Sequence, residues 1–281
     1  MKTWFFSEDA YPNLPDDETY ESIRVNLPNK HFDPEVGADL FNMYLDIWGA
    51  ADEMGLEIML NEHHQTATCL LSAAPIALGV LARETKNARL LILGNPIVNR
   101  KQPIRVAEEM AYIDVLSRGR LDCGFVRGVP YEIAPANAYP YRGSEKLWEA
   151  HDLIMKAWTH HDGPFNFEGR WFHARQVNIW PRPYQQPHPP VWVTMGSADS
   201  AAQVARRKHV GAVFLSGYSN IRRLFDGYRE GYLEVHGEEA PLDRLAYAAI
   251  IHVGKNERVA EQGAEKLLWY IRSNKVAPQF N

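Results

Sequence analysis

The sequence alternates short apolar runs with stretches of helical periodicity, and this alternation constrains the fold more than any other feature. Apolar residues recur three and four positions apart in the helical stretches, whereas the runs between them are almost continuously apolar. This order is typical of βα units around a parallel sheet, so we predict an α/β fold. The predicted strands are residues 4–7, 56–60, 88–98, 121–126, 190–195, 211–215 and 246–253, and the predicted helices are residues 34–54, 72–85, 103–116, 143–159, a helix from 197, and 256–271.

Two long irregular segments interrupt the pattern. The loop that reaches residue 33 is unusually long for a βα connection, so we expect it to cover an active site. Residues 160–190 form an insertion after the fourth strand, predicted as a lid or hairpin, whose aromatic residues either line an apolar pocket or hold the loop down. We expect one domain over residues 1–281 that lacks an eighth strand; either residues absent from this sequence or some other element completes it.

Composition and charge narrow the class of partner. The chain is 46% hydrophobic and 23% charged, which suits a globular protein with a sizeable core. Its formal net charge of -5 argues against a general nucleic-acid or acidic-membrane surface, because both need a clustered excess of Lys and Arg. We therefore expect a small-molecule substrate and no nucleic-acid partner.

The cysteines and the N-terminus indicate the compartment. Cys69 and Cys123 each lie in an apolar stretch, as buried thiols do, and not in a disulfide or Cys-rich metal pattern. The first apolar patch is too short for a signal peptide, and no run reaches the roughly 18 apolar residues of a membrane span. We expect a cytoplasmic protein that does not bind a membrane.

A polar cluster follows the second predicted strand. In a parallel barrel the functional groups lie at the carboxyl ends of the strands, where this sequence has Asn61, Glu62, His63 and His64. Adjacent histidines on a loop are often only solvated or capped, and that interpretation stays open. Their spacing disfavours a metal site, because neighbouring residues on an extended chain point to opposite sides. No metal is predicted here.

Further polar residues follow the third and fourth strands. Asn95 interrupts an apolar strand end, where its amide either bonds a cofactor ring or satisfies neighbouring backbone. Arg127 and Gly128 close the fourth strand; the arginine either steers an anionic ligand or forms a structural ion pair, and the glycine lets the backbone approach a ligand. Tyr131, just beyond, is placed to stack or to donate a hydrogen bond.

A serine-rich turn joins the fifth strand to its helix. It comprises residues 196–200, with Gly196, Ser197 and Ser200 as the candidate ligand-binding residues. Backbone N–H groups and serine hydroxyls at a helix N-terminus suit a phosphate group. An ordinary N-cap made by Ser197 or Asp199 is the alternative.

The ordered set of sequence blocks resembles the bacterial luciferase-like family of flavin-dependent monooxygenases. Each block is moderately specific, but together they run in the family's order over nearly the whole chain. The blocks are residues 55–64 (GLEIMLNEHH), 72–75 (SAAP), 103–109 (PIRVAEE), 116–121 (LSRGRL), 124–128 (GFVRG) and 187–193 (PHPPVWV).

The resemblance implies a TIM-like (β/α)8 barrel that binds FMN, uses reduced flavin to activate O₂, and forms a dimer or higher oligomer. It implies that His63 is the active-site histidine, that Asn95 and Tyr131 lie near the flavin, and that Gly196 and Ser197 lie at its phosphate. A histidine that titrates near neutrality suits proton transfer, which the protein must manage while the flavin does the oxygen chemistry.

The sequence is compatible with three functions. The first is a monooxygenase that receives FMNH₂ from a separate reductase and oxygenates a small apolar substrate; no GxGxxG nicotinamide fingerprint follows a strand. The second is a dehydrogenase or reductase of the same superfamily that uses the deazaflavin F420. The third is a non-catalytic flavin-binding subunit.

Overall fold

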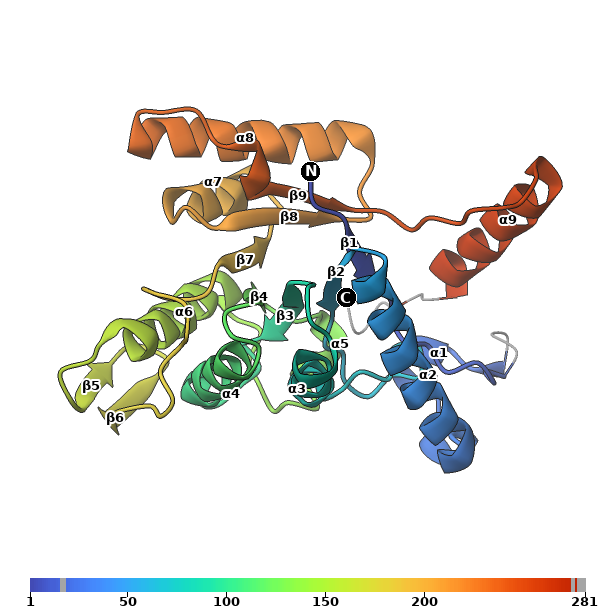
Figure 1. Cartoon of the computed structure of the whole chain (residues 1–281), viewed down its shortest axis with the longest axis horizontal. Coiled ribbons are helices and arrows are strands. Elements are labelled where there is room, and N and C mark those ends of the chain that lie inside the picture. The colour runs from blue at the N-terminus through green and yellow to red at the C-terminus, as the bar shows by residue number, and fades with distance from the viewer. Residues whose placement is uncertain (16–18, 274–275, 277–281) are drawn as a thin grey trace.

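The fold is built on one curled sheet of parallel strands. The computed structural model describes residues 1–15, 19–273 and 276. Within them the main sheet has seven strands in the order β1-β2-β3-β4-β7-β8-β9, and every neighbouring pair is parallel (Figure 1). The strands are β1 Trp4–Phe6, β2 Glu57–Leu60, β3 Leu90–Pro96, β4 Leu121–Val126, β7 Val191–Thr194, β8 Val210–Phe214 and β9 Leu245–Ala248.

Helices cover the outer face of this sheet. In Figure 1, α7 and α8 lie together above the curled sheet, whereas α3, α4 and α6 lie below it. Helix α9 stands apart on an extended segment. None of the helices in the described residues is long and apolar enough to cross a membrane. The helices are α1 Ile23–Asn26, α2 Pro34–Glu53, α3 Ala74–Glu84, α4 Pro103–Leu116, α5 Pro130–Ile133, α6 Gly143–Thr159, α7 Ala198–Arg206, α8 Tyr218–His236 and α9 Glu257–Ser273, with 3-10 turns at Asn29–His31 and Leu242–Arg244.

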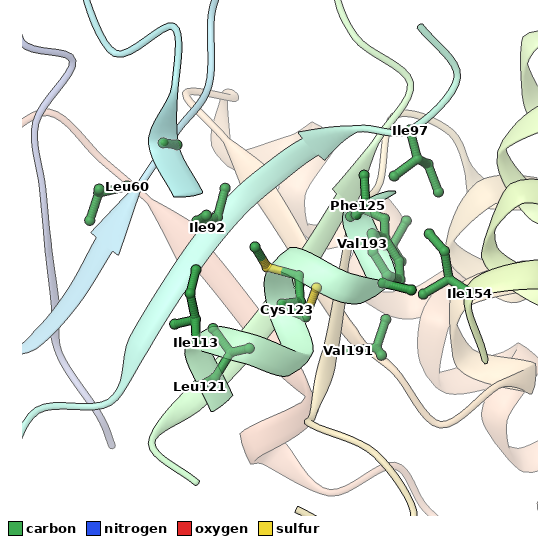
Figure 2. Close-up of a cluster of buried hydrophobic side chains, with 14 of the residues drawn as sticks. Leu60, Ile92, Ile97, Ile113, Leu121, Cys123, Phe125, Ile154, Val191 and Val193 are labelled. Carbon is green, nitrogen blue, oxygen red and sulfur yellow. The ribbon is translucent and has the colours of Figure 1, made fainter. Parts of the chain in front are cut away.

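Alternating side chains give the sheet two apolar faces. In β3, Leu91 and Leu93 pack inside the curl, whereas Leu90 and Ile92 pack outward against the helices. Figure 2 shows the outer layer, where strand residues lie near residues of the covering helices. Burial on both faces explains why the strands are nearly continuous apolar runs in the sequence.

The sheet curls far enough for its first strand to face its later ones. The rings of Trp4 and Trp192 meet edge to face with centroids 5.2 Å apart, and those of Phe6 and Phe214 do so at 5.8 Å. The first strand is not a neighbour of β7 or β8 in the sheet, so these contacts cross the interior. In the described residues no strand joins β9 to β1, as the sequence predicts, so the fold is a TIM-like α/β fold without its last strand.

The structure corrects the sequence prediction in two places. The predicted last strand, residues 246–253, ends early: β9 pairs only with β8, and beyond the Phe214–Ala248 pair it has no partner, so Ile251 and Val253 are exposed. In addition, the segment that forms α8 was not predicted as a helix. That helix buries Leu224, Tyr228, Gly231 and Tyr232, a helical spacing present in the sequence.

The insertion contains a hairpin, as predicted. Its strands are β5 Phe165–Glu168 and β6 His173–Val177, which pair antiparallel. Trp158, Phe165 and Phe172 are buried in the outer core, so these aromatic residues hold the insertion against the barrel. Both cysteines are buried and free, which confirms the prediction of buried thiols.

A buried histidine pair joins α6 to β8. Nε2 of His151 lies 2.8 Å from Nε2 of His209, and Nδ1 of His151 lies 2.8 Å from the carboxylate of Asp152. Burial lowers the pKa of His151, and burial together with the facing charges of His151, His188, Arg207 and Arg244 lowers the pKa of His209 to about 2. Both rings are therefore neutral in the folded protein at neutral pH.

This pair predicts a pH dependence of stability. His209 takes up a proton below about pH 6.5 in the unfolded chain but only near pH 2 in the folded one. The contribution of neutral His209 to the free energy of unfolding is therefore complete above about pH 6.5. Below that pH it falls by about 1.4 kcal/mol per pH unit. Urea unfolding at pH 7, 6 and 5 measures the slope. His209→Gln should make it shallower than in wild type, whereas His161→Gln, on the exposed part of the insertion, should leave it unchanged; equal slopes for all three proteins would contradict the assignment.

Candidate active site

The predicted site residues gather at one edge of the sheet. Because the strands are parallel, their carboxyl ends meet at the same edge. The polar cluster that begins at Asn61 follows β2, Arg127 follows β4, and Gly196 follows β7 two positions after its last residue. Since β4 and β7 are neighbours, the last two segments come from adjacent strands (Figure 1).

His63 is held by a carboxylate that was not predicted from the sequence. Nδ1 of His63 lies 2.9 Å from Oε1 of Glu132, and the backbone N–H of His64 donates to the same oxygen at 3.0 Å. Glu132 belongs to α5, in the segment after β4, and is 2% exposed. Burial alone would raise the pKa of Glu132, but the hydrogen bonds and the charge from His63, together with the amide of His64, lower it. Glu132 is therefore an ionised acceptor.

His64 has a different carboxylate. Its Nε2 lies 3.1 Å from Oε1 of Glu62, which also accepts from Nη2 of Arg100 at 2.9 Å. The hydrogen bond that His64 donates to Glu62 is the main cause of a raised pKa for His64, and burial opposes this shift. The side chain of Glu62 is fully buried. These contacts hold His64 in an ion-pair cluster with a buried carboxylate and an arginine.

Tyr131 lies beside His63 and is buried. Its hydroxyl accepts from Nε of Arg24 at 3.0 Å and lies 3.5 Å from Nδ1 of His63. Burial raises the pKa of Tyr131, with Arg24 opposing the shift, so the hydroxyl keeps its proton at neutral pH. Arg24 also donates to Thr68 at 2.8 Å. Arg24 belongs to the long first loop, which therefore contacts Tyr131, and the cover of an active site by this loop stays a prediction.

Asn95 lies in β3 and turns toward the helix layer. Alternation from Leu91 and Leu93 would place it inside the curl, but the register with β4 shifts between Ile92 and Asn95. Its Nδ2 donates to the carbonyl of Gly124 at 3.0 Å and lies near sulfur atoms of the outer layer. Its Oδ1 is buried and has no partner among the described residues. The amide thus satisfies neighbouring backbone, and a contact with the cofactor stays a prediction.

Arg127 is free to meet an anion. It is exposed, and in the described part of the chain it makes no hydrogen bond or ion pair. The alternative of a structural ion pair is therefore not what the described residues show. Its side chain lies next to Gly143 at the start of α6. Gly128 has φ +83°, and a Cβ there would lie 2.5 Å from the amide nitrogen of Asn99, so only glycine fits this turn.

The serine turn forms a closed capping box at the start of α7. The Ser197 hydroxyl accepts from the N–H of Ser200 at 3.2 Å, while the Ser200 hydroxyl accepts from the N–H groups of Gly196 and Ser197 at 3.0 and 2.9 Å. The N-cap alternative is therefore what the structure shows. The turn is largely exposed, and its role toward a phosphate stays a prediction.

Asp9 is a further strand-end residue that sequence reasoning missed. It follows β1, is fully buried, and neither of its carboxylate oxygens has a hydrogen-bond partner among the described residues. Burial raises its pKa to about 7, against the weaker effect of the Ser7 hydroxyl. The acid is therefore partly protonated at neutral pH. Its place in a short acidic stretch of the long first loop is typical of an exposed residue and carries no sign of such burial.

A pocket opens beside His64, and His63 is not among the residues that line it. It has a volume of about 390 Å³, within the usual range for small-molecule sites, and His64, Arg100 and Glu132 lie on its wall. Asn99 and Glu109 also line it, and they keep buried polar atoms without partners in the described chain. No group of three or more His, Cys, Asp or Glu side chains among the described residues is arranged to hold a metal ion.

A comparison of the sequence with protein-family models decides the family. The model described as luciferase-like monooxygenase matches residues 25–280. The chain belongs to the luciferase-like monooxygenase family. This confirms the resemblance drawn from the ordered sequence blocks.

Individual relatives share a low sequence identity with this chain. The oxygenase component of a flavin-dependent trigonelline monooxygenase from Acinetobacter baylyi is 27% identical over 227 residues, which cover 77% of this chain and 62% of the relative. This chain thus aligns with a little under two thirds of that relative's length.

Two solved structures share the luciferase-like fold. The oxygenating constituent of 3,6-diketocamphane monooxygenase from Pseudomonas putida, in complex with FMN, superimposes with a TM-score of 0.75 at 17% identity, covering 95% of this chain and 71% of that one. An F420-dependent secondary alcohol dehydrogenase superimposes with a TM-score of 0.64 at 16% identity, covering 88% and 68%. At these identities the likeness concerns the fold.

Proposed function

We propose that this protein is an FMN-dependent monooxygenase that uses reduced flavin and O₂ to oxygenate a small apolar organic substrate. The observation that carries the proposal is that three features follow strands at one edge of the sheet: a carboxylate-held histidine after β2, an arginine without a partner in the described residues after β4, and the N-terminus of α7 after β7. Membership of the luciferase-like family supports it. The flavin supplies the electrons and the site of O₂ activation when it is bound.

The residues of this chain then have distinct tasks. His63 takes up and returns a proton, Tyr131 lines the ring site, and Asn95 holds the adjacent backbone through its hydrogen bond to the carbonyl of Gly124. The phosphate group is bound by Arg127, Gly128 and the turn that contains Gly196, Ser197 and Ser200. The unpaired guanidinium of Arg127 fits this task because nothing in the described chain neutralises it.

The partners follow from the same proposal. A separate reductase supplies reduced FMN, as the name "oxygenase component" of the trigonelline relative suggests. The protein acts in the cytoplasm as a homodimer or higher homo-oligomer. Exposed apolar residues on α4, among them Tyr112 and Leu116, offer a face for that association.

Two measurements test the function. Equilibrium titration with FMN, reduced FMN and F420 should show tight binding of reduced FMN and weak binding of F420. Incubation with FMNH₂ and ¹⁸O₂, using a bicyclic ketone as the first apolar substrate, should then yield a product that contains one ¹⁸O atom. Tight F420 binding with weak FMN binding would instead favour an F420-dependent dehydrogenase, which the fold of the F420-dependent neighbour keeps as the second candidate.

The phosphate assignment gives a charge-specific prediction. Ser197→Asp and Ser197→Asn both keep an N-cap side chain on α7, but only the aspartate adds a negative charge. Two like charges about 4 Å apart repel by about 4 kcal/mol at an effective dielectric constant near 20, and solvent lowers this value at an exposed turn. We expect the FMN dissociation constant to rise at least about 10-fold for aspartate and to change little for asparagine. Equal affinities, measured by titration, would remove the assignment.

A further inference from the structure

The contact between His63 and Glu132 joins two segments far apart in the sequence. His63 follows β2, whereas Glu132 belongs to α5, and the two residues are 69 positions apart. One carboxylate oxygen of Glu132 receives both the imidazole Nδ1 at 2.9 Å and the N–H of His64 at 3.0 Å. The second bond holds the backbone of the histidine segment, so the ring and its support are fixed to the same atom.

The chemistry of this contact determines which ring nitrogen carries the proton. An ionised carboxylate can only accept, and the lowered pKa keeps Glu132 ionised. Nδ1 of His63 must therefore be the donor. The hydroxyl of Tyr131 lies 3.5 Å from the same nitrogen, farther than the carboxylate oxygen, and it can accept as well as donate. In the neutral ring, Nε2 is then the bare, basic nitrogen.

Nε2 of His63 has no hydrogen-bond partner in the described chain. No hydrogen bond to Nε2 of His63 is present in residues 1–15, 19–273 or 276, and the side chain is 17% exposed. His64 is held in the opposite sense, because its Nε2 is the atom that meets Glu62 at 3.1 Å. The two adjacent histidines thus use two buried carboxylates and present opposite ring nitrogens.

We propose that Glu132 is a positioning residue that fixes His63 in the Nδ1–H form and leaves Nε2 to accept and return the proton of the reaction. This rests on the proposed function, since it names the atom through which His63 acts. Nε2 gains a proton from the reacting group to form the imidazolium, and returns it in the second half of the cycle. Nδ1 keeps its proton throughout, and Glu132 acts through His63.

The tautomer can be measured directly without a substrate. The full chain labelled with ¹⁵N-histidine is studied by long-range ¹H–¹⁵N correlation NMR at pH 8, and the signals of His63 and His64 are assigned by His63→Gln and His64→Gln. We expect a bare Nε2 and a protonated Nδ1 for wild-type His63. An Nε2–H form of His63 in the wild-type protein would overturn the proposal, whatever the variants do.

Two matched variants separate the carboxylates. Glu132→Gln keeps the size of the side chain, but the glutamine amide can donate as well as accept. The His63 signals should therefore change to those of a mixture of tautomers, while the His64 signals stay unchanged. Glu62→Gln is the control, because it should change the His64 signals and leave those of His63 unchanged. Glu132→Gln without any effect on the His63 tautomer would overturn the proposal.

Turnover then distinguishes this inference from the proposed function. Glu132→Gln should lower kcat on the order of 10²-fold with little change in KM, and Glu132→Asp, which restores the carboxylate, should recover part of both the tautomer and the rate. A changed tautomer with unchanged oxygenation would remove His63 from the proposed function but leave the tautomer assignment intact. A lower rate with an unchanged tautomer would overturn positioning by Glu132.

Discussion

Replacing His63 with alanine is expected to lower oxygenation by about 10²- to 10⁴-fold, the usual contribution of a positioned acid or base. The variant removes Nε2, the nitrogen of the His63 ring that the described residues leave without a hydrogen bond. FMN affinity should be retained, because the proposed phosphate contacts at Arg127 and Ser197 come from other strands. Steady-state turnover with FMNH₂, together with an FMN titration, measures both quantities.

His64→Ala is the matched control for this variant. The two side chains are identical and adjacent, but His64 is tied to Glu62 and Arg100, so its removal should affect stability more than turnover. If His63→Ala turned over as fast as wild type, His63 would lose its proposed role. The alternative of a non-catalytic flavin-binding subunit would then gain support.

Trp158→Ala should cause the largest loss of stability, about 3–5 kcal/mol in the free energy of unfolding. The ring is fully buried at the end of α6, its Nε1 donates to the carbonyl of Ala107 at 2.9 Å, and it stacks between Phe125 and His188. Alanine would leave both a cavity and an unpaired carbonyl in the outer core. Urea unfolding followed by circular dichroism measures the change.

Trp180→Ala provides the comparison. Trp180 lies in the insertion and is 84% exposed, so its truncation should change the free energy of unfolding by no more than about 0.5 kcal/mol. Equal losses for the two tryptophan variants would contradict the view that the insertion is held by its buried aromatic residues. A loss below about 1 kcal/mol for Trp158→Ala would contradict the packing described for α6.

The strands were largely predictable because burial on both faces of the sheet requires nearly continuous runs of apolar residues in the sequence. All seven residues of β3 are buried and every one except Asn95 is nonpolar, so the existence of the strand needs no tertiary information. The last strand was predicted too long because its length depends on a partner: Ile251 and Val253 are as apolar as strand residues, but β8 ends before it could pair with them.

The candidate site was predictable in part, residue by residue. Its placement at strand ends singled out His63, and the family resemblance strengthened that choice. Glu132 and Arg24 were missed because they carry no local signal: one follows a tyrosine in a short helix and the other lies in a long irregular loop. Their importance comes from atoms 2.9 and 3.0 Å away on residues distant in the sequence.

By itself, the sequence determined the parallel α/β architecture, the order of its elements and the family, because apolar periodicity and ordered motifs are properties of the chain. Only the tertiary structure decided where the polar side chains point and which of their atoms are held by hydrogen bonds. Alternation along β3 would turn Asn95 inward, and a shift in register with β4 turns it outward. Likewise, His63 and His64 are chemically identical in the sequence, and only the carboxylates that packing brings to them set which nitrogen each presents.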